Sequence, residues 1–87
     1  MIESLKGILH KKDPTTAIID VGGVRLSVNI TLSTYEKLEE INSSIELLTY
    51  FNVREDAMEL YGFIDDNERY LFKQLTSING IGPKSAL

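Results

Sequence analysis

Residues 18–30, IIDVGGVRLSVNI, decide the fold because they form a β-hairpin pattern in one continuous stretch. Gly22 and Gly23 provide the two-residue turn, since glycine tolerates the positive φ that tight hairpin turns require. After the turn, apolar residues alternate with polar ones, which is the period of a strand with one buried face. The sequence therefore predicts strands over 15–21 and 24–30, with the Val, Leu and Ile side chains of the second facing the core.

Three further strands are predicted around this hairpin. The first covers residues 2–11, where Gly7 interrupts the apolar alternation and indicates a bulge or bend. The next covers 45–54 and carries apolar residues on both faces, which indicates cover by the core and by a partner. The last covers 58–64, and its Tyr61-Gly62-Phe63 sequence indicates a bend.

A short helix is predicted between the third and fourth strands. Ser33 and Glu36 form a capping box, and the helix extends to about Leu38. Five strands with a helix at this point have the element order of an OB-fold, a partly open Greek-key barrel that binds oligonucleotides and other ligands. A small SH3-like barrel would have a similar pattern. We therefore expect a mainly β chain with some α, in which residues 1–64 form a five-stranded OB-fold barrel.

Residues 65–87 are predicted to open a second domain with almost no linker. Asp65 and Glu68 form another capping box. The apolar residues that follow are spaced as one face of a helix: Leu71, Phe72, Leu75 and Ile78. Because the chain ends just after a further helix has begun, we expect it to be a fragment of a longer protein.

The final stretch, 75–87 (LTSINGIGPKSAL), resembles the helix-hairpin-helix motif of sequence-independent DNA-binding proteins. Gly80 and Gly82 allow the backbone to approach a ligand closely, and Pro83 suits a first helical turn. The N–H groups of the turn and of the helix N-terminus would favour a phosphate oxygen, and Lys84 adds a positive charge. The alternative is a helix C-cap followed by a loop, since one Gly-x-Gly is a weak signal.

The charge of the chain changes sign along its 87 residues, which carry a net −4. Residues 1–66 contain six Lys or Arg and twelve Asp or Glu, whereas residues 67–87 contain three and one. An acidic body with a basic end is compatible with DNA contact on one face. The sequence has no cysteine, which excludes disulfides and thiolate metal sites. No apolar run reaches membrane-spanning length, and we expect a cytoplasmic location.

Between the last two predicted strands lie Arg54, Glu55, Asp56 and Ala57. Two adjacent carboxylates on a protruding turn repel phosphates, at roughly 1 kcal/mol per close pair in water. Such a tip would accept separated DNA strands around it and disfavour a continuous duplex across it. The simpler interpretation is a charged turn that is merely solvated.

Four segments together resemble the RuvA family of bacterial Holliday-junction-recognition proteins: MIESLKGIL, IIDVGGVRLSVNI, FNVREDAMELYGF and LFKQLTSINGIGPKSAL. The resemblance implies an OB-fold, then a domain with two helix-hairpin-helix motifs, then a mobile domain that engages the RuvB motor. It also implies a homotetramer on four-way junction DNA, which the RuvC resolvase can join. Glu3 and Ser4 depart from the glycine and basic residue that are common in the family, which argues against DNA contact there.

By the same resemblance, Glu55 and Asp56 form an acidic pin at the tetramer centre, and Arg54 beside them orients the pin or contacts DNA backbone. The first phosphate-binding hairpin is matched by Gly80, Gly82 and Lys84. The implied function is to hold the junction open and position the ATP-driven motor for branch migration in recombination, repair and the SOS response. The chain itself would need no cofactor. Without the second hairpin and the motor-binding domain, we expect these residues to bind junctions weakly and not to stimulate branch migration.

An enzyme is the first alternative. A metal-dependent nuclease would use Glu55, Asp56, Asp65 and Asp66, and a helix-hairpin-helix repair enzyme such as a glycosylase would have its catalytic residues beyond this chain. Adjacent carboxylates rarely converge on two metals, and the single histidine, His10, lies in a predicted strand. We therefore expect no catalytic residue and no metal site.

A single-strand-binding OB-fold is the second alternative. Tyr50, Tyr61 and Phe63 would then serve as platforms on which bases stack. Such aromatic residues are more often part of a core or a subunit interface, and the surrounding barrel is acidic.

Overall fold

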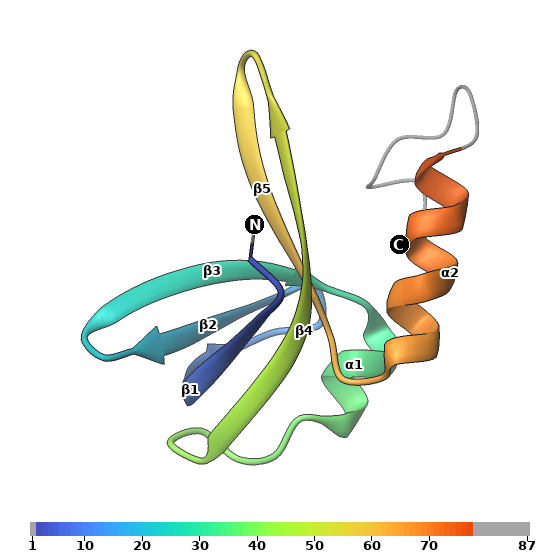
Figure 1. Ribbon diagram of the computed structural model, residues 1–87. Coiled ribbons are helices and arrows are strands. Elements are labelled where there is room, and N and C mark those ends of the chain that lie inside the picture. Colours follow the sequence, from blue (N-terminus) through green and yellow to red (C-terminus); the bar gives the residue numbers. More distant parts are fainter. Residues whose placement is uncertain (1, 78–87) are drawn as a thin grey trace.

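The computed structural model describes residues 2–77 and contains five strands and two helices in this part of the chain. In order they are β1 (Ser4–Lys12), β2 (Thr16–Val21), β3 (Val24–Ile30), α1 (Leu32–Lys37), β4 (Ser44–Arg54), β5 (Ala57–Phe63) and α2 (Asp66–Thr76). The strands close into a barrel in the order β1-β2-β3-β5-β4 (Figure 1). The prediction of a mainly β, five-stranded OB-fold barrel with a helix after the third strand is confirmed.

Closure of the barrel depends on two pairings. Residues 4–8 of β1 pair with β4, and residues 8–12 of the same strand pair with β2, so β1 joins the two halves of the sheet. On the other side, β3 and β5 run parallel and pair through Asn29↔Tyr61 and Ile30↔Gly62. The other neighbouring strands are antiparallel.

The glycine turn between β2 and β3 has the predicted geometry. Gly22 and Gly23 have φ values of 62° and 98°, and the Gly23 N–H donates to Asp20 Oδ1 at 2.8 Å. The inward face of β3 is shorter than predicted. Val28 is fully buried, but Val24 is 60% exposed because the hairpin extends beyond the core.

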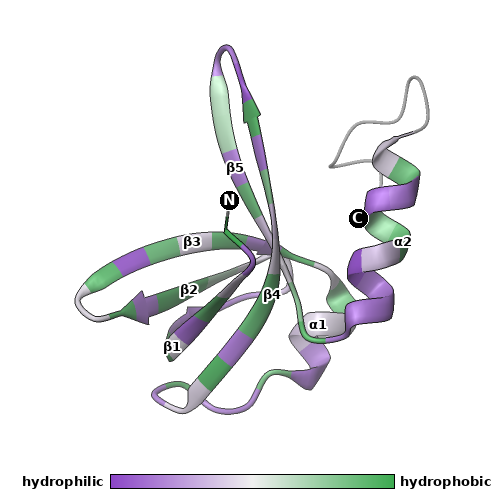
Figure 2. Ribbon diagram, viewed as in Figure 1, coloured by the Kyte–Doolittle hydropathy of each residue, from purple (hydrophilic) through white to green (hydrophobic). Residues whose placement is uncertain are grey.

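Two hydrophobic clusters stabilise the fold. The first fills the barrel with Leu5, Leu9, Ala17, Ile19, Val28, Ile30, Leu38, Leu47 and Leu60. The second lies between the β4–β5 hairpin and α2 and consists of Tyr61, Phe63 and Phe72, with Tyr50 packed against them. Figure 2 shows the alternation of hydrophobic and hydrophilic residues along the strands that produces the barrel interior. Each fully buried large apolar side chain contributes about 1.5–3 kcal/mol relative to exposure.

Two glycines in the strands have roles that differ from the predictions. The register shift in β1 lies between Leu9 and Lys11, so the prediction of a bulge at Gly7 is wrong. Gly7 is instead required for close packing, because a Cβ there would collide with the carbonyl oxygen of Asp20. At Gly62 the strand is not interrupted, since β4 and β5 pair continuously through this residue, and a Cβ there would crowd Val28 and Leu47.

The start of α1 lies two residues earlier than predicted. Thr31, not Ser33, is the N-cap, and its Oγ1 accepts the Thr34 N–H at 3.0 Å. The Thr31 hydroxyl can accept this bond and donate to Glu68 at the same time, which favours it over Ser33 as the cap. As expected, Leu38 is buried and Tyr35 packs against the barrel core.

Of the two residues predicted to form a capping box at the start of α2, only Asp65 has the predicted role. Asp65 is the N-cap and accepts the Asn67 N–H at 2.8 Å. Glu68 does not complete a capping box, because its carboxylate accepts hydrogen bonds from Thr31 and Thr34 instead.

The predicted apolar face of α2 is buried only at its centre. Phe72 is 2% exposed, whereas Leu71 is 60% exposed and Leu75 is 39% exposed. Ile78 lies outside the described residues. The additional cover that the sequence predicted for β4 is provided in part by α2, whose Phe72 packs against Tyr50.

We expect Gly62→Ala to destabilise the barrel by about 1–3 kcal/mol, because overpacking forces a well-packed core to shift. The added Cβ would lie 2.6 Å from Val28 Cγ1 and 3.0 Å from Leu47 Cδ1. Urea unfolding would measure the loss. The double variant Gly62→Ala/Val28→Ala opens space for the new methyl group, so its loss should be smaller than the sum of the two single losses. Strict additivity would contradict this explanation.

Candidate nucleic-acid interface

The β4–β5 hairpin extends out of the barrel and carries the predicted acidic tip. Its strands pair without a break from Leu48↔Phe63 to Arg54↔Ala57, and the turn between them consists of Glu55 and Asp56. Both turn residues are exposed. In Figure 1 the hairpin projects from the barrel beside α2. The structure therefore places the two predicted pin residues at the outermost point of a paired, regular element.

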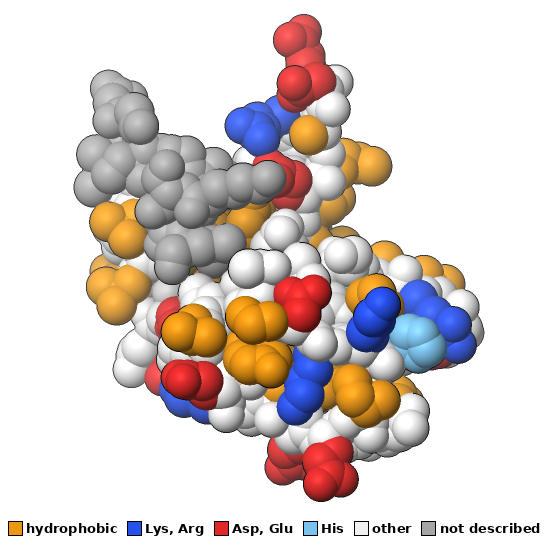
Figure 3. Space-filling view, turned by 180° about the vertical axis from the view of Figure 1, so that it is seen from behind, with side chains coloured by type: hydrophobic (Ala, Val, Ile, Leu, Met, Phe, Trp, Pro, Cys, Tyr) orange, Lys and Arg blue, Asp and Glu red, His pale blue; other side chains and the backbone are white. Residues whose placement is uncertain are grey.

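The charges of the tip are only partly neutralised. Arg54 Nη2 lies 2.8 Å from Glu59 Oε1, an ion pair across the two strands. Within residues 2–77, neither Glu55 nor Asp56 forms an ion pair. Acidic side chains accordingly occupy the end of the projection in Figure 3. Arg54 thus lies beside the pin as predicted, but it binds Glu59 rather than the two tip carboxylates.

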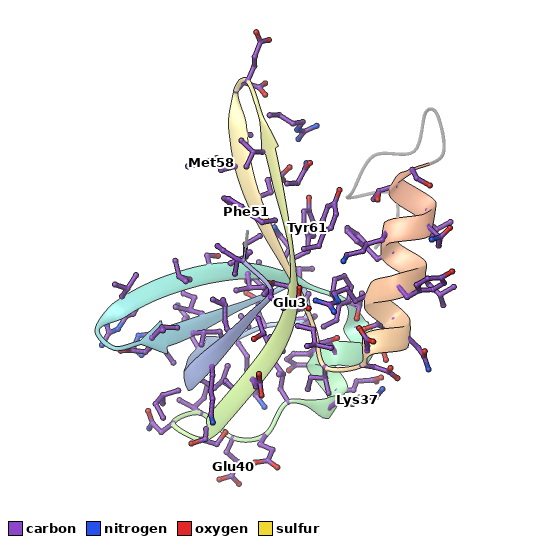
Figure 4. The ribbon with its side chains drawn as sticks, in the orientation of Figure 1. Glu3, Lys37, Glu40, Phe51, Met58 and Tyr61 are labelled. Carbon is purple, nitrogen blue, oxygen red and sulfur yellow. The ribbon has the colours of Figure 1, made fainter. Side chains whose placement is uncertain are left out.

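The base of the hairpin is fixed by four aromatic rings. Phe72 of α2 lies with its ring centroid 5.3 Å from Tyr50, 5.1 Å from Tyr61 and 5.1 Å from Phe63. These separations lie in the range of favourable aromatic pairs, each worth about 0.5–1.5 kcal/mol beyond area burial. Figure 4 shows Tyr61 on the side of the hairpin that faces α2. The cluster holds the base of the hairpin and α2 together.

The Tyr61 hydroxyl is buried in this cluster and has no hydrogen-bond partner within the described residues. Burial raises the pKa of Tyr61 to about 12, and the nearby negative charge of Glu59 adds to the shift. A phenolate here would be both desolvated and close to a carboxylate, so the neutral form is favoured.

The opposite side of the hairpin is apolar and partly uncovered. Val53 pairs with Met58, and Phe51 pairs with Leu60, so these side chains share one face. Val53 is 54% exposed and Met58 is 73% exposed. Met58 and Phe51 lie on the side away from α2 in Figure 4.

Several residues of the two alternative functions have other roles in the fold. Tyr61 and Phe63 are 0% exposed, so they cannot serve as platforms for stacked bases. For a nuclease, Asp65 would have to join the tip carboxylates, but it caps α2, and Asp66 binds Arg69 at 3.0 Å. The described part of the chain contains no cluster of three potential metal ligands.

Three charged residues make key polar contacts of this region: Glu59, Glu68 and Arg69. The sequence analysis selected neither Glu59 nor Arg69, and it assigned Glu68 only to a capping box. Most of these contacts join residues 20 to 66 positions apart in the sequence, so no local pattern indicates them. A local pattern exists for one contact: Asp66 and Arg69 are three residues apart on α2, a spacing that allows an ion pair along a helix.

The predicted phosphate-binding residues Gly80, Gly82 and Lys84 lie outside the described residues. Their role stays a prediction. Within residues 2–77, neither helix is long and apolar enough to cross a membrane.

Comparison with known proteins identifies the family. A family model described as the RuvA N terminal domain matches residues 1–62. The chain belongs to the RuvA family. It is 46% identical over 86 residues to the Holliday junction branch migration complex subunit RuvA of Chloroherpeton thalassium, covering 99% of this chain and 43% of that protein. The RuvA proteins of Francisella tularensis subsp. novicida and Amoebophilus asiaticus are each 42% identical over 87 residues, covering this whole chain and 40% and 45% of theirs. The chain thus spans less than half the length of these RuvA relatives.

We expect Tyr61→Phe to reduce the loss of stability at alkaline pH. In the folded chain the pKa of Tyr61 is about 12, above the ordinary value of 10.0, so the unfolded chain releases this proton first. Stability should therefore be unaffected by this group below pH 10 and should fall as the pH rises from 10 to 12. Urea midpoints measured across this window should fall less for Tyr61→Phe than for the wild type.

Tyr70→Phe is the matched control, because Tyr70 is 62% exposed on α2. Its urea midpoints should follow those of the wild type. Identical pH profiles for the two variants would contradict a raised pKa at Tyr61.

Proposed function

We propose that this chain is the junction-recognising part of a non-catalytic DNA-binding subunit, which holds a Holliday junction open. The observation that carries the proposal is the projecting β4–β5 hairpin, whose tip presents Glu55 and Asp56 without an ion-pair partner in the described residues. Membership of the RuvA family supports it, because the relatives are named as subunits of a Holliday junction branch migration complex.

The tip acts by repulsion. A duplex that ran across it would bring phosphates close to two carboxylates, at a cost of roughly 1 kcal/mol per close pair in water and more where solvent is excluded. An open junction offers strands that separate at the crossover, so the tip can lie between them. The continuous strand pairing and the aromatic base keep the carboxylates at a fixed height above the barrel.

DNA affinity comes from other residues. Gly80, Gly82 and Lys84 are proposed to bind backbone phosphates through N–H groups, a helix N-terminus and one positive charge. Phosphate contacts carry no direct sequence information, so binding is largely independent of sequence and weakens as salt rises. The acidic body of the chain then limits contact to the intended face.

We further propose that the full-length protein forms a homotetramer, in which four hairpins meet at the junction centre. The exposed apolar pair Val53 and Met58 offers a surface that a neighbouring subunit can cover. The assembly would position the RuvB motor, which uses ATP, and admit the RuvC resolvase, in recombination and DNA repair in the cytoplasm. The chain itself is proposed to need neither a cofactor nor a catalytic residue.

Binding of the full-length protein to a four-way junction and to linear duplex of equal length tests the proposal. The wild type should prefer the junction. The double variant Glu55→Gln/Asp56→Asn removes both tip charges, so it should lose much of this preference, mainly by binding duplex more tightly. Equilibrium titration at a fixed salt concentration would measure both affinities.

Glu39→Gln/Glu40→Gln is the matched control. Both residues are exposed and lie after α1, and Figure 4 shows Glu40 at the end of the barrel away from the hairpin. This variant has the same net charge as the tip variant but should retain the junction preference. Equal binding of the wild type to the two DNAs would overturn junction recognition. If both variants lost the preference equally, net charge rather than the pin would be the cause.

A further inference from the structure

Helix α2 is attached to the barrel through its first two turns. Glu68 and Arg69 make polar contacts with the barrel and α1, Phe72 packs against the aromatic residues of β4 and β5, and Lys37 approaches the capping Asp65 at 4.0 Å. Beyond Phe72, residues 73–75 are exposed. The direction of the helix is therefore set near its N-terminus, while its C-terminal half is held by few contacts.

Arg69 fixes one side of the helix to the barrel strands. Its Nη1 donates to the carbonyl oxygen of Glu3 at 3.1 Å and to that of Thr49 at 3.4 Å, and it lies 2.9 Å from the Glu3 carboxylate. Its Nη2 bonds Asp66 in the preceding turn at 3.0 Å. The Arg69 side chain is only 11% exposed, whereas the carboxylates of Glu3 and Asp66 remain exposed at 77% and 75%. One guanidinium thus joins α2 to the start of β1 and to β4.

Glu68 fixes the other side of the helix to α1. Its Oε1 accepts hydrogen bonds from Thr34 Oγ1 at 2.8 Å and from Thr31 Oγ1 at 3.0 Å. Thr34 is 1% exposed, so its hydroxyl depends on this carboxylate and has little access to water. Hydrogen bonds to a charged group are stronger than those between neutral groups, so Glu68 holds α1 firmly.

The three side chains surround the attachment point. Successive helical residues are about 100° apart, so Phe72 lies between Glu68 and Arg69 around the helix axis. An apolar contact alone is not directional and would let the helix rotate or tilt about Phe72. The two polar contacts, to α1 on one side and to β1 and β4 on the other, oppose such movement.

We propose that Glu68 and Arg69 are positioning residues that fix the angle between α2 and the β4–β5 hairpin. This inference rests on the proposed function, because the chain runs from the end of α2 directly into the expected phosphate-binding segment. The expected binding residues follow α2 in the sequence. The angle fixed by the clamp that Glu68 and Arg69 form therefore influences which DNA geometry can satisfy both the tip and those residues.

Distances between paired spin labels test the clamp directly. The 87 residues contain no cysteine, so one cysteine can be introduced at Ala57 on the hairpin and one at Gln74 on α2, in full-length protein otherwise free of cysteine. Gln74 is exposed, and Ala57 is partly exposed and lies outside the apolar pair Val53 and Met58 that a neighbouring subunit is proposed to cover. Labelled chains are diluted with unlabelled chains, so that distances within one subunit are measured. The wild-type clamp should give a narrow distance distribution. Glu68→Met/Arg69→Met should broaden it, because α2 then swings about Phe72. An unchanged distribution would overturn the proposal.

Two controls separate a loosened angle from a loosened fold. Labels at Ala57 and the exposed Ser27 on β3 report the hairpin against the barrel, and their distribution should not change in the clamp variant. Arg25→Met removes an exposed arginine that pairs with Asp20 far from α2, and it should leave both label pairs unchanged. Equal broadening in the Arg25→Met protein would show that loss of any arginine suffices, which contradicts a specific role for the clamp.

If the methionine variant unfolds, the conservative variant Glu68→Gln/Arg69→Lys tests whether Glu68 and Arg69 fix the angle of α2. Glutamine keeps an acceptor oxygen for the threonine hydroxyls, and lysine keeps a cationic donor, but lysine lacks the fork that reaches two carbonyl groups. We expect intermediate broadening at Ala57–Gln74 and none at Ala57–Ser27. Absence of any broadening in this folded variant would refute the proposal.

The preference for junction over duplex DNA, measured for the wild type and the clamp variant, distinguishes a failure of this inference from a failure of the proposed function. In the clamp variant the preference for junction over duplex should fall about tenfold, the size expected when one charged hydrogen bond that orients a site is lost. If the wild type shows no junction preference but the label distances still broaden, the clamp stands and the proposed function fails. If the wild type prefers the junction and the distances stay narrow, the clamp is refuted alone.

Discussion

The uninterrupted pairing of β4 with β5 is the constraint on which the other features depend. The inner half of this ladder belongs to the barrel, and the outer half leaves it and ends at two carboxylates. The same strands present Tyr50, Tyr61 and Phe63 to α2 on one face. One pair of strands therefore closes the core, supports a helix and carries a charged tip. Local disorder at the base would affect all three at once.

Much of the fold could be predicted because its signals are local. The glycine turn, the alternation in the strands and the capping residue Asp65 each occupy a few neighbouring positions, and the structure confirms them. The errors arise where a distant residue competes with a local pattern. Thr31 is the cap of α1 in place of Ser33, and its second bond goes to Glu68, 37 positions away. Gly7 and Gly62 appear in the sequence as irregularities, but crowding by Asp20, Val28 and Leu47 explains them.

The candidate site, like the fold, could be predicted only where its signals are local. Two adjacent acidic residues between strands already indicate a charged tip, because a two-residue turn must be exposed. That Arg54 would bind Glu59 follows only from the register, which places both side chains on the face of the hairpin toward α2. The exposed pair Val53 and Met58 likewise becomes visible once the hairpin is known to extend beyond the barrel. Burial of Tyr61 and Phe63, which removes them as stacking platforms, required the position of Phe72.

The regular pairing of the hairpin also restricts how its length can evolve. Each added residue per strand advances the tip by about 3.4 Å and turns the following side chains to the opposite face. A single added residue pair would move Val53 and Met58 to the side of α2 and expose the Arg54–Glu59 ion pair on the other side. Insertions of two residues per strand preserve both faces and raise the tip by about 7 Å. The reach of such a hairpin is therefore adjustable only in steps, and homologous proteins should differ in hairpin length by even numbers of residues per strand.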